Sequence, residues 1–191
     1  MNTAPDVVAF IVGFGLSFLF ASRGVSGDGL PTWIGLLFGA ITAYALSNLA
    51  GNRKVATADQ AARTAALAMA PPPGKALIYL YREGFVGMAA GLNVAVDGKT
   101  IAQLTSPRFT CCVVSPGPHT LSAAFGGLAG PQNRSEAVEV MASPASVHVY
   151  RLSLSLGALK NTIKATPVTD LAAAKATLGR MKMTTPDLAE V

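Results

Sequence analysis

Two apolar runs near the N-terminus, Val7–Ser22 and Leu30–Ala50, constrain this chain more than any other feature. With a few flanking residues the first run reaches the roughly 20 residues that a membrane-spanning helix needs, and the second is long enough by itself. Helices are expected because lipid offers no hydrogen-bond partners to an exposed backbone. Only residues 23–29 separate the runs, so the sequence predicts a transmembrane helical hairpin over residues 1–55.

Small residues recur at every fourth position in both runs. The stripe includes Gly13, Ser17, Gly35, Gly39, Ala43 and Ser47. Small side chains let two helix backbones approach closely, which is how helices associate in lipid. We interpret the stripe as a helix-packing surface, although Gly and Ala are also simply frequent in this chain.

A cleaved signal peptide is the main alternative for the first run. Signal peptides typically begin with basic residues and end at a small-residue cleavage site. The residues before the first run contain no Lys or Arg, and no such cleavage site follows it cleanly. We therefore favour the membrane span.

Composition limits what the rest of the chain can be. Of 191 residues 51% are hydrophobic and 13% charged, and the net charge is +5. The basic excess is a mild bias towards anionic lipid headgroups and is too diffuse to indicate nucleic-acid binding. Cys111 and Cys112 are adjacent, so we expect two strand residues on opposite faces rather than a disulfide or a zinc site.

Residues 56–74 are predicted to be a stalk. The segment Ala56–Ala70 contains good helix formers, with Thr57 or Asp59 as a possible N-cap. Three consecutive prolines at 71–73 end that helix and favour an extended joint.

From residue 75 to 167 the pattern changes to period two with frequent turn residues, which is typical of an all-β sandwich or barrel. The expected strands are Lys75–Arg82, Leu92–Val96, Thr100–Leu104, Arg108–Val114, His119–Phe125, Glu136–Met141, Ser146–Leu156 and Thr162–Pro167. Asp97-Gly98 predicts a tight hairpin, because both residues tolerate positive φ. The predicted fold class is therefore a membrane-anchored α+β protein with an antiparallel β-sandwich.

The last segment, residues 168–191, is predicted to be a C-terminal helix and tail. The helix covers Leu171–Met183, with Leu171, Leu178 and Met181 on one face. Basic residues are frequent here and just after the second apolar run. The candidates for contact with lipid headgroups or a partner are Arg53, Lys54, Lys160, Lys164, Lys175, Arg180 and Lys182. A solvated face is the alternative for the C-terminal part of this group.

Four segments resemble an uncharacterised bacterial envelope domain that is often found in small lipoproteins. They are ALIYLYRE, NVAVDGKTIAQL, PGPHTLSAAF and VHVYRLSLS. The matching positions are Tyr79, Tyr81, Arg82, Asp97, Gly98, Lys99, Pro116, Gly117, His119, Leu121, Tyr150 and Leu152. The resemblance implies a small transthyretin-like sandwich and a periplasmic location, although members of that family are commonly tethered by lipid rather than by two helices.

No catalytic motif stands out in the sequence. It contains no Gly-x-Ser-x-Gly elbow, and its glycine-rich stretches lack the setting of a phosphate loop. The two histidines, His119 and His148, are expected to be hydrogen-bonded structural residues; an enzyme would need both to converge with a carboxylate such as Asp97. We predict no enzyme, no catalytic residues, no metal ligands and no cofactor.

These patterns favour a non-catalytic accessory or scaffold subunit that docks on a larger membrane complex through its hairpin and its sandwich. The alternative is a membrane-anchored envelope module that binds a small ligand, a lipid headgroup or a polymer. The expected partners are the lipid bilayer and other integral membrane subunits, without nucleic acid. We expect a bacterial inner-membrane location with two spans. The positive-inside bias of Arg53, Lys54 and Arg63 places the β-domain in the cytoplasm, whereas the resemblance implies the periplasm.

Overall fold

The chain divides into two compact units, Met1–Asn52 and Arg53–Val191. The computed structural model describes residues 37, 40, 41, 52–85, 88–126, 135, 137–155 and 162–191. In the first unit Leu37, Ala40 and Ile41 have α-helical backbone conformation. The predicted hairpin and its packing residues Gly13, Ser17, Gly35, Gly39, Ala43 and Ser47 lie outside the described residues. Within the described part, no helix combines the length and the apolar character needed to cross a membrane.

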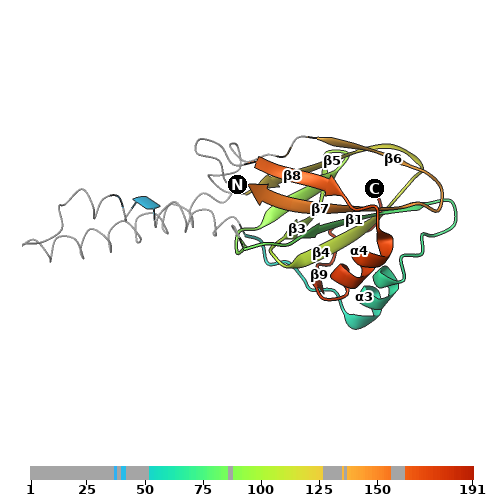
Figure 1. Cartoon of the computed structure of the whole chain (residues 1–191), viewed down its shortest axis with the longest axis horizontal. Helices are drawn as coiled ribbons and strands as arrows, with labels where there is room; N and C mark the ends of the chain where they lie inside the picture. The colour runs from blue at the N-terminus through green and yellow to red at the C-terminus, as the bar shows by residue number, and fades with distance from the viewer. Residues whose placement is uncertain are drawn as a thin grey trace, which may run out of the picture. The chain divides into compact units, whose positions relative to one another are not determined.

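The second unit is mostly β-structure and contains two short helices (Figure 1). Its elements are α3 (Gln60–Leu67), β1 (Ala76–Arg82), β2 (Leu92–Val96), β3 (Lys99–Leu104), β4 (Arg108–Val114), β5 (Gly117–Phe125), β6 (Val138–Ala142), β7 (Val147–Ser155), β8 (Thr162–Pro167), α4 (Leu171–Leu178) and β9 (Lys182–Met183). All eight expected strands are confirmed, with ends within two residues of the expectation. The hairpin at Asp97-Gly98 is also confirmed, with φ of 51° and 75°.

The strands form two sheets in the orders β8-β7-β1-β4-β9 and β3-β2-β5-β6. Their facing sides enclose one apolar core, to which the alternating residues Leu121 and Ala123 of β5 and Leu152 of β7 contribute. The β-sandwich prediction is therefore confirmed. The expectation of purely antiparallel strands is wrong, because β7 pairs with β1, and β9 with β4, in parallel. Each parallel neighbour comes from far along the chain, where no hairpin turn dictates direction.

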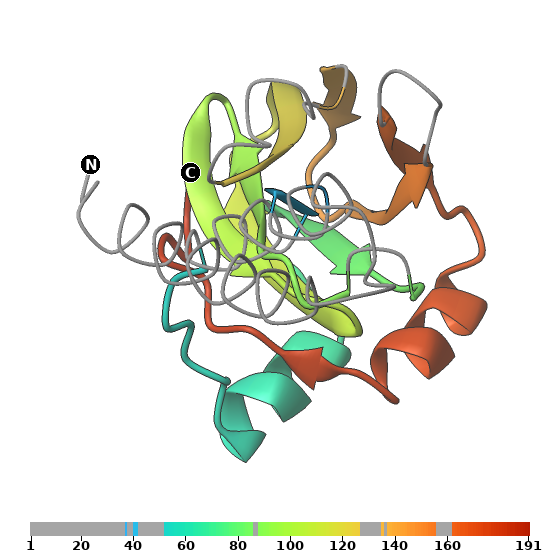
Figure 2. The ribbon, with the colours of Figure 1, turned by 90° about the vertical axis from the view of Figure 1, so that its left-hand side faces the viewer.

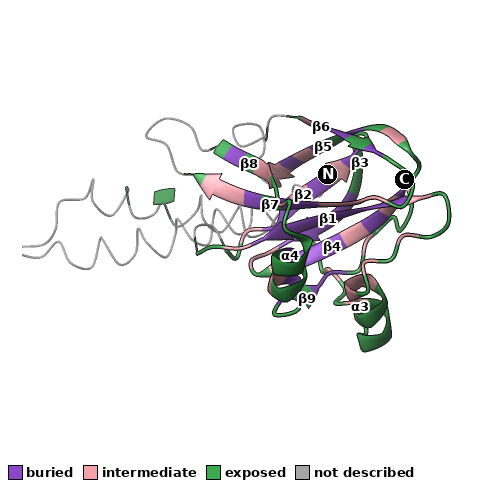
Figure 3. Ribbon diagram, turned by 45° about the vertical axis from the view of Figure 1, so that its right-hand side comes forward, coloured by how far each residue is buried: buried purple, intermediate pink, exposed green. Residues whose placement is uncertain are grey.

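Strand β1 is the central strand of the five-stranded sheet and is buried along its whole length (Figure 3). Ile78 and Leu80 face the core between the sheets, whereas Leu77 and Tyr79 face a second core. That second core lies beneath α3 and α4, which cover the same face of the five-stranded sheet (Figure 2). The two cysteines of β4 divide as expected, with Cys112 in the first core and Cys111 against the second.

The predicted stalk is folded onto this domain, so its interpretation as a separate linker was wrong. Asp59 caps α3 by accepting a hydrogen bond from Ala62 N–H at 2.7 Å. Ala66 and Leu67 pack into the second core, and the hydroxyl of Tyr79 donates to Ala66 O. Residues 56–74 could not be recognised as packed because their short apolar side chains also suit an exposed helix.

The predicted C-terminal helix is too long. Helix α4 ends at Leu178, and Lys182–Met183 instead forms β9 at the edge of the larger sheet. Leu178 and Met181 are buried as expected, but Leu171 is 40% exposed. The sheet edge offers backbone hydrogen bonds that compete with another helical turn, and Thr184 N–H donates to Phe109 O at 2.8 Å.

The two ends of the sandwich differ in the residues that they carry. Strands β1, β3, β5 and β7 all end on the same side of the sandwich, which we call the proximal end. We chose this name because the unit begins at Arg53, and Arg53 hydrogen-bonds to β3 close to that end. We call the opposite end, which carries the Asp97-Gly98 turn, the distal end.

Candidate functional site

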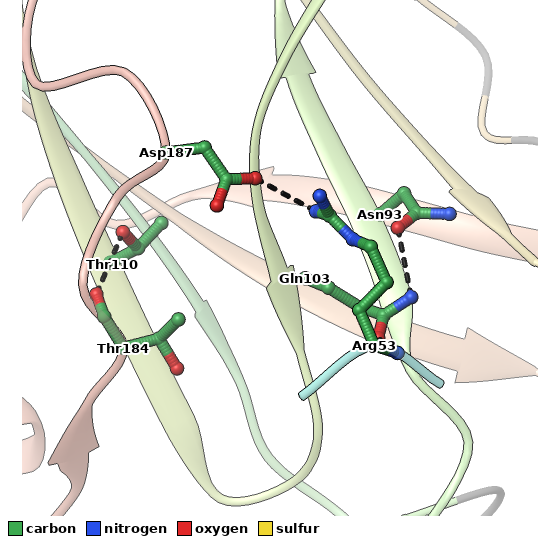
Figure 4. Close-up of polar contacts among 6 residues, drawn as sticks. All are labelled: Arg53, Asn93, Gln103, Thr110, Thr184 and Asp187. Carbon is green, nitrogen blue, oxygen red and sulfur yellow. Dashed lines mark hydrogen bonds and ion pairs between the residues drawn. The ribbon is translucent and has the colours of Figure 1, made fainter. Parts of the chain in front are cut away.

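The first residue of the second unit is held firmly at the proximal end. The backbone N–H of Arg53 donates to Gln103 Oε1 at 2.7 Å, and its guanidinium pairs with Asp187 at 2.8 Å (Figure 4). Gln103 is buried and donates in turn to Asn93 Oδ1 at 2.9 Å. The chain therefore enters the sandwich through a hydrogen-bonded junction that joins it to β3 and to the C-terminal tail.

The residues just after Arg53 are held by the same tail. Ala58 N–H donates to Met183 O and Thr185 N–H donates to Ala56 O, both at 3.0 Å. Thr57, which does not cap α3, accepts a hydrogen bond from Arg108 at 3.1 Å. These contacts leave no free linker between Arg53 and α3.

The structure brings most of the described basic candidates towards the proximal end. In the pairing of β9 with β4, Lys182 lies opposite Arg108 at the start of β4. In the pairing of β8 with β7, Lys164 lies opposite Ser153 near the end of β7. Arg180 lies two residues before Lys182, and Lys54 follows Arg53; both are exposed. Lys175 is exposed on α4. Lys160 lies outside the described residues.

A cleft of about 440 Å³ opens at the proximal end. It is lined by Arg82, Glu83, Gly84, Phe85, Arg151, Ser153 and Leu154. Arg151 pairs with Glu83 at 3.3 Å on its rim, where both side chains are well exposed. The cleft therefore combines charged groups with an apolar ring.

Arg82 forms the floor of this cleft and is only 2% exposed. One guanidinium nitrogen donates to Ala90 O and to Leu104 O, and the guanidinium carbon lies 5.2 Å from the centroid of the Phe125 ring. Burial lowers the pKa of Arg82 to about 10, so it stays protonated at neutral pH. A buried cation thus fixes the loop between β1 and β2 to the end of β3.

The outer face of the four-stranded sheet carries a shallow hollow of about 310 Å³. Its lining residues include Asn93, Ala95, Thr100, Ser122 and Ala124. At the edge of the same sheet Met141 is 67% exposed. Small side chains on a sheet face leave room for close approach by another backbone.

At the distal end Asp97 and His119 converge. His119 is 8% exposed, with Nδ1 2.7 Å from Asp97 Oδ2 and Nε2 2.7 Å from Ser115 O. Both neighbours are acceptors, so both ring nitrogens donate when both contacts are made. His148 lies 2.9 Å from Ser146 Oγ, and burial together with the charge of His119 lowers the pKa of His148.

The arrangement leaves His119 poorly suited to act as a base. Burial lowers its pKa, but the hydrogen bonds to Ser115 O and Asp97 outweigh that effect and raise the pKa overall. Both nitrogens are already engaged, as expected for a structural histidine. Among the described residues, no group of three or more His, Cys, Asp or Glu side chains could hold a metal ion.

The fold and these contacts define a β-sandwich module with a helical layer on one face and a cationic proximal end. No protein-family model, curated protein or solved structure matches this chain. The resemblance to the envelope domain therefore stays a prediction.

Sequence analysis missed three residues of the proximal cleft as candidates for binding: Arg82, Phe85 and Arg151. In the sequence Arg82 stands out only as part of the motif that resembles the envelope domain. Phe85 belongs to no motif and lies in the loop after Arg82. A large aromatic residue in a loop beside Gly84 was the one local signal for an exposed apolar group. Arg151 sits in an apolar strand, and its side chain points away from the core.

Proposed function

We propose that this chain is a non-catalytic, membrane-anchored accessory subunit that docks on a larger membrane protein complex. The supporting observation is the junction at Arg53, which ties the first residue of the sandwich to Gln103 and Asp187. This junction makes the sandwich begin at Arg53, which suits a module that follows its anchor directly in the chain.

The anchor in this proposal is the apolar run that ends at Ala50. Only Gly51 and Asn52 lie between that run and Arg53. Since each residue spans at most about 3.6 Å, the backbone of Arg53 would lie within roughly 11 Å of the end of the span. It could then contact the extramembrane part of a neighbouring subunit but could not reach far from the bilayer.

The partner surface we propose is the hollowed outer face of the four-stranded sheet. Its small side chains, such as Ala95 and Ala124, would allow a partner to pack closely, and Met141 would add an apolar contact at the edge. Methionine side chains adapt readily to irregular surfaces.

A pull-down in mild detergent, through a tag at the C-terminus, tests this proposal. We expect the wild-type chain to recover a membrane protein in stoichiometric amount, identified by mass spectrometry. Ala124→Arg should reduce that recovery by roughly tenfold, because a bulky charge in the hollow blocks close packing and tenfold corresponds to about 1.4 kcal/mol. Ala172→Arg, on the exposed side of α4, is the matched control. A monomer without a partner, or equal loss with both variants, would contradict the proposal.

A second expected result concerns the small-residue stripe. Gly39→Leu should weaken the assembly in detergent, because a large side chain separates helices that pack through small residues. Blue native gels would show the complex shift towards free chain. Phe14→Leu, outside the stripe, serves as control and should leave the complex intact; an unchanged complex with Gly39→Leu would remove the support that the stripe gives.

A further inference from the structure

Among the described residues of the second unit, positive charge is concentrated towards the proximal end. The basic residues at or next to that end are Arg53, Lys54, Arg63, Arg108, Arg151, Lys164, Arg180 and Lys182. Among the described residues, the carboxylates found there are Asp59, Glu83 and Asp187. Each of these carboxylates already accepts a hydrogen bond, from Ala62 N–H, Arg151 and Arg53 respectively.

The remaining exposed or half-buried charges that the structure describes nearly cancel, with three basic and four acidic residues. The other exposed or half-buried basic residues are Lys75, Lys99 and Lys175, and the other acidic residues are Asp97, Glu139, Asp170 and Glu190. The described part of the domain is therefore electrically polarised, with its positive excess on the side where the chain enters.

The same end presents exposed apolar side chains. Phe85 is 85% exposed, the highest value among the large apolar residues that the structure describes, and Met88 in the same loop is 40% exposed. Arg82 fixes this loop from below through its bond to Ala90 O. The exposed ring of Phe85 shares its cleft with Arg151, and an aromatic side chain together with cations is typical of surfaces that bind the interface of a membrane.

We propose that the proximal end is a docking surface for an anionic phospholipid bilayer. Phe85 and Met88 enter the headgroup region, while Lys54, Arg151 and the neighbouring cations contact lipid phosphates. This inference rests on the membrane anchor of the proposed function, because only Gly51 and Asn52 separate the second apolar run from Arg53. It also specifies the ligand of the alternative function, a membrane-anchored binding module, as a lipid headgroup.

The test uses the full chain in lipid nanodiscs and one fluorescent side chain. Trp33, the single tryptophan, is first replaced by Phe, and Phe85→Trp or Met141→Trp is then introduced. Both positions are exposed, so neither change disturbs a core. Lipids with brominated acyl chains quench a tryptophan that lies at the interface.

We expect brominated anionic nanodiscs to lower the emission of Phe85→Trp by about twofold, because interfacial side chains lie roughly 5–10 Å into the headgroup and acyl boundary. Met141→Trp, on the edge strand β6, should change little. Zwitterionic lipid should quench Phe85→Trp less, and Lys54→Glu with Lys182→Glu should reduce the quenching in anionic lipid. Lys99→Glu, at the distal turn, is the charge-matched control.

An alkaline carbonate wash of the membranes separates the two proposals. If the wild-type chain is washed off, the anchor and the proposed function both fail. If it is retained but Phe85→Trp is quenched no more than Met141→Trp, the bilayer surface is overturned and the anchor stands. That result is also the one expected if a protein, rather than lipid, covers Phe85. Equal quenching in anionic and zwitterionic lipid would overturn the proposed preference for an anionic bilayer.

Discussion

Replacing Arg82 with methionine is expected to lower the free energy of unfolding by about 3 kcal/mol. The guanidinium is buried and donates to Ala90 O and Leu104 O, so its loss leaves one partly buried and one buried carbonyl without these donors. Each such loss costs about 1–3 kcal/mol. Methionine replaces part of the packing against Phe125 and removes a buried charge, which keeps the total below the sum of the two losses.

The matched control for this prediction is Arg151→Met. Arg151 carries the same charge at the same end, but it is exposed and its ion pair with Glu83 is 3.3 Å long. Exposed pairs contribute about 0–1 kcal/mol. Urea unfolding in detergent, followed by circular dichroism, measures both variants. Similar losses in the free energy of unfolding for the two variants would show that the burial of Arg82 adds no stability beyond that of an exposed arginine.

Replacing Asp97 with asparagine is expected to make stability less dependent on pH and to cost about 1–2 kcal/mol in mildly acidic solution, where a charge-assisted hydrogen bond is lost. Asparagine tolerates the φ of 51° at this turn and can still accept from Thr120 N–H. The change therefore isolates the charge that faces His119. Glu139→Gln, an exposed carboxylate on β6, is the control.

The direction of the pH effect is set by two shifts of opposite sign. The pKa of His119 is raised, so its contribution is fully present below its ordinary value of 6.5 and is lost as pH rises through the folded-state value. Burial raises the pKa of Asp97, but the Thr120 N–H and His119 outweigh this and lower it overall. The contribution of Asp97 is therefore present above its ordinary value of 3.8 and is lost as pH falls through the folded-state value.

The pair should accordingly stabilise the fold most between about pH 4 and pH 6.5. Denaturation at pH 5.5, 7 and 9 measures the effect. We expect the difference between wild type and Asp97→Asn to shrink as pH rises. A constant difference over that range would mean that protonation of His119 does not contribute to stability.

The order of strands along the chain could be predicted from sequence because alternation and turn chemistry are local. Leu121, Ala123 and Phe125 alternate with residues of the outer face, and Asp97-Gly98 defines its hairpin without help from distant segments. Such signals lie within a few residues of one another, so they can be recognised from the sequence alone. The proximal basic residues Arg53 and Lys54 were identified for the same reason, since they come directly after an apolar run.

Other features depend on contacts between segments that are distant in sequence. The parallel pairing of β7 with β1, the packing of α3 on the larger sheet and the end of α4 at Leu178 each depend on which surface lies nearby in space.

The candidate site divides in the same way. The sequence alone determined two apolar runs, eight strands and a basic chain. Only the tertiary structure decided that Arg82 is buried, that Phe85 is exposed beside it, and that cations from α3, β4, β7, β8 and β9 lie towards the proximal end. Burial of a charge depends on acceptors such as Ala90 O and Leu104 O, which local pattern does not reveal, because only folding brings them within hydrogen-bond distance.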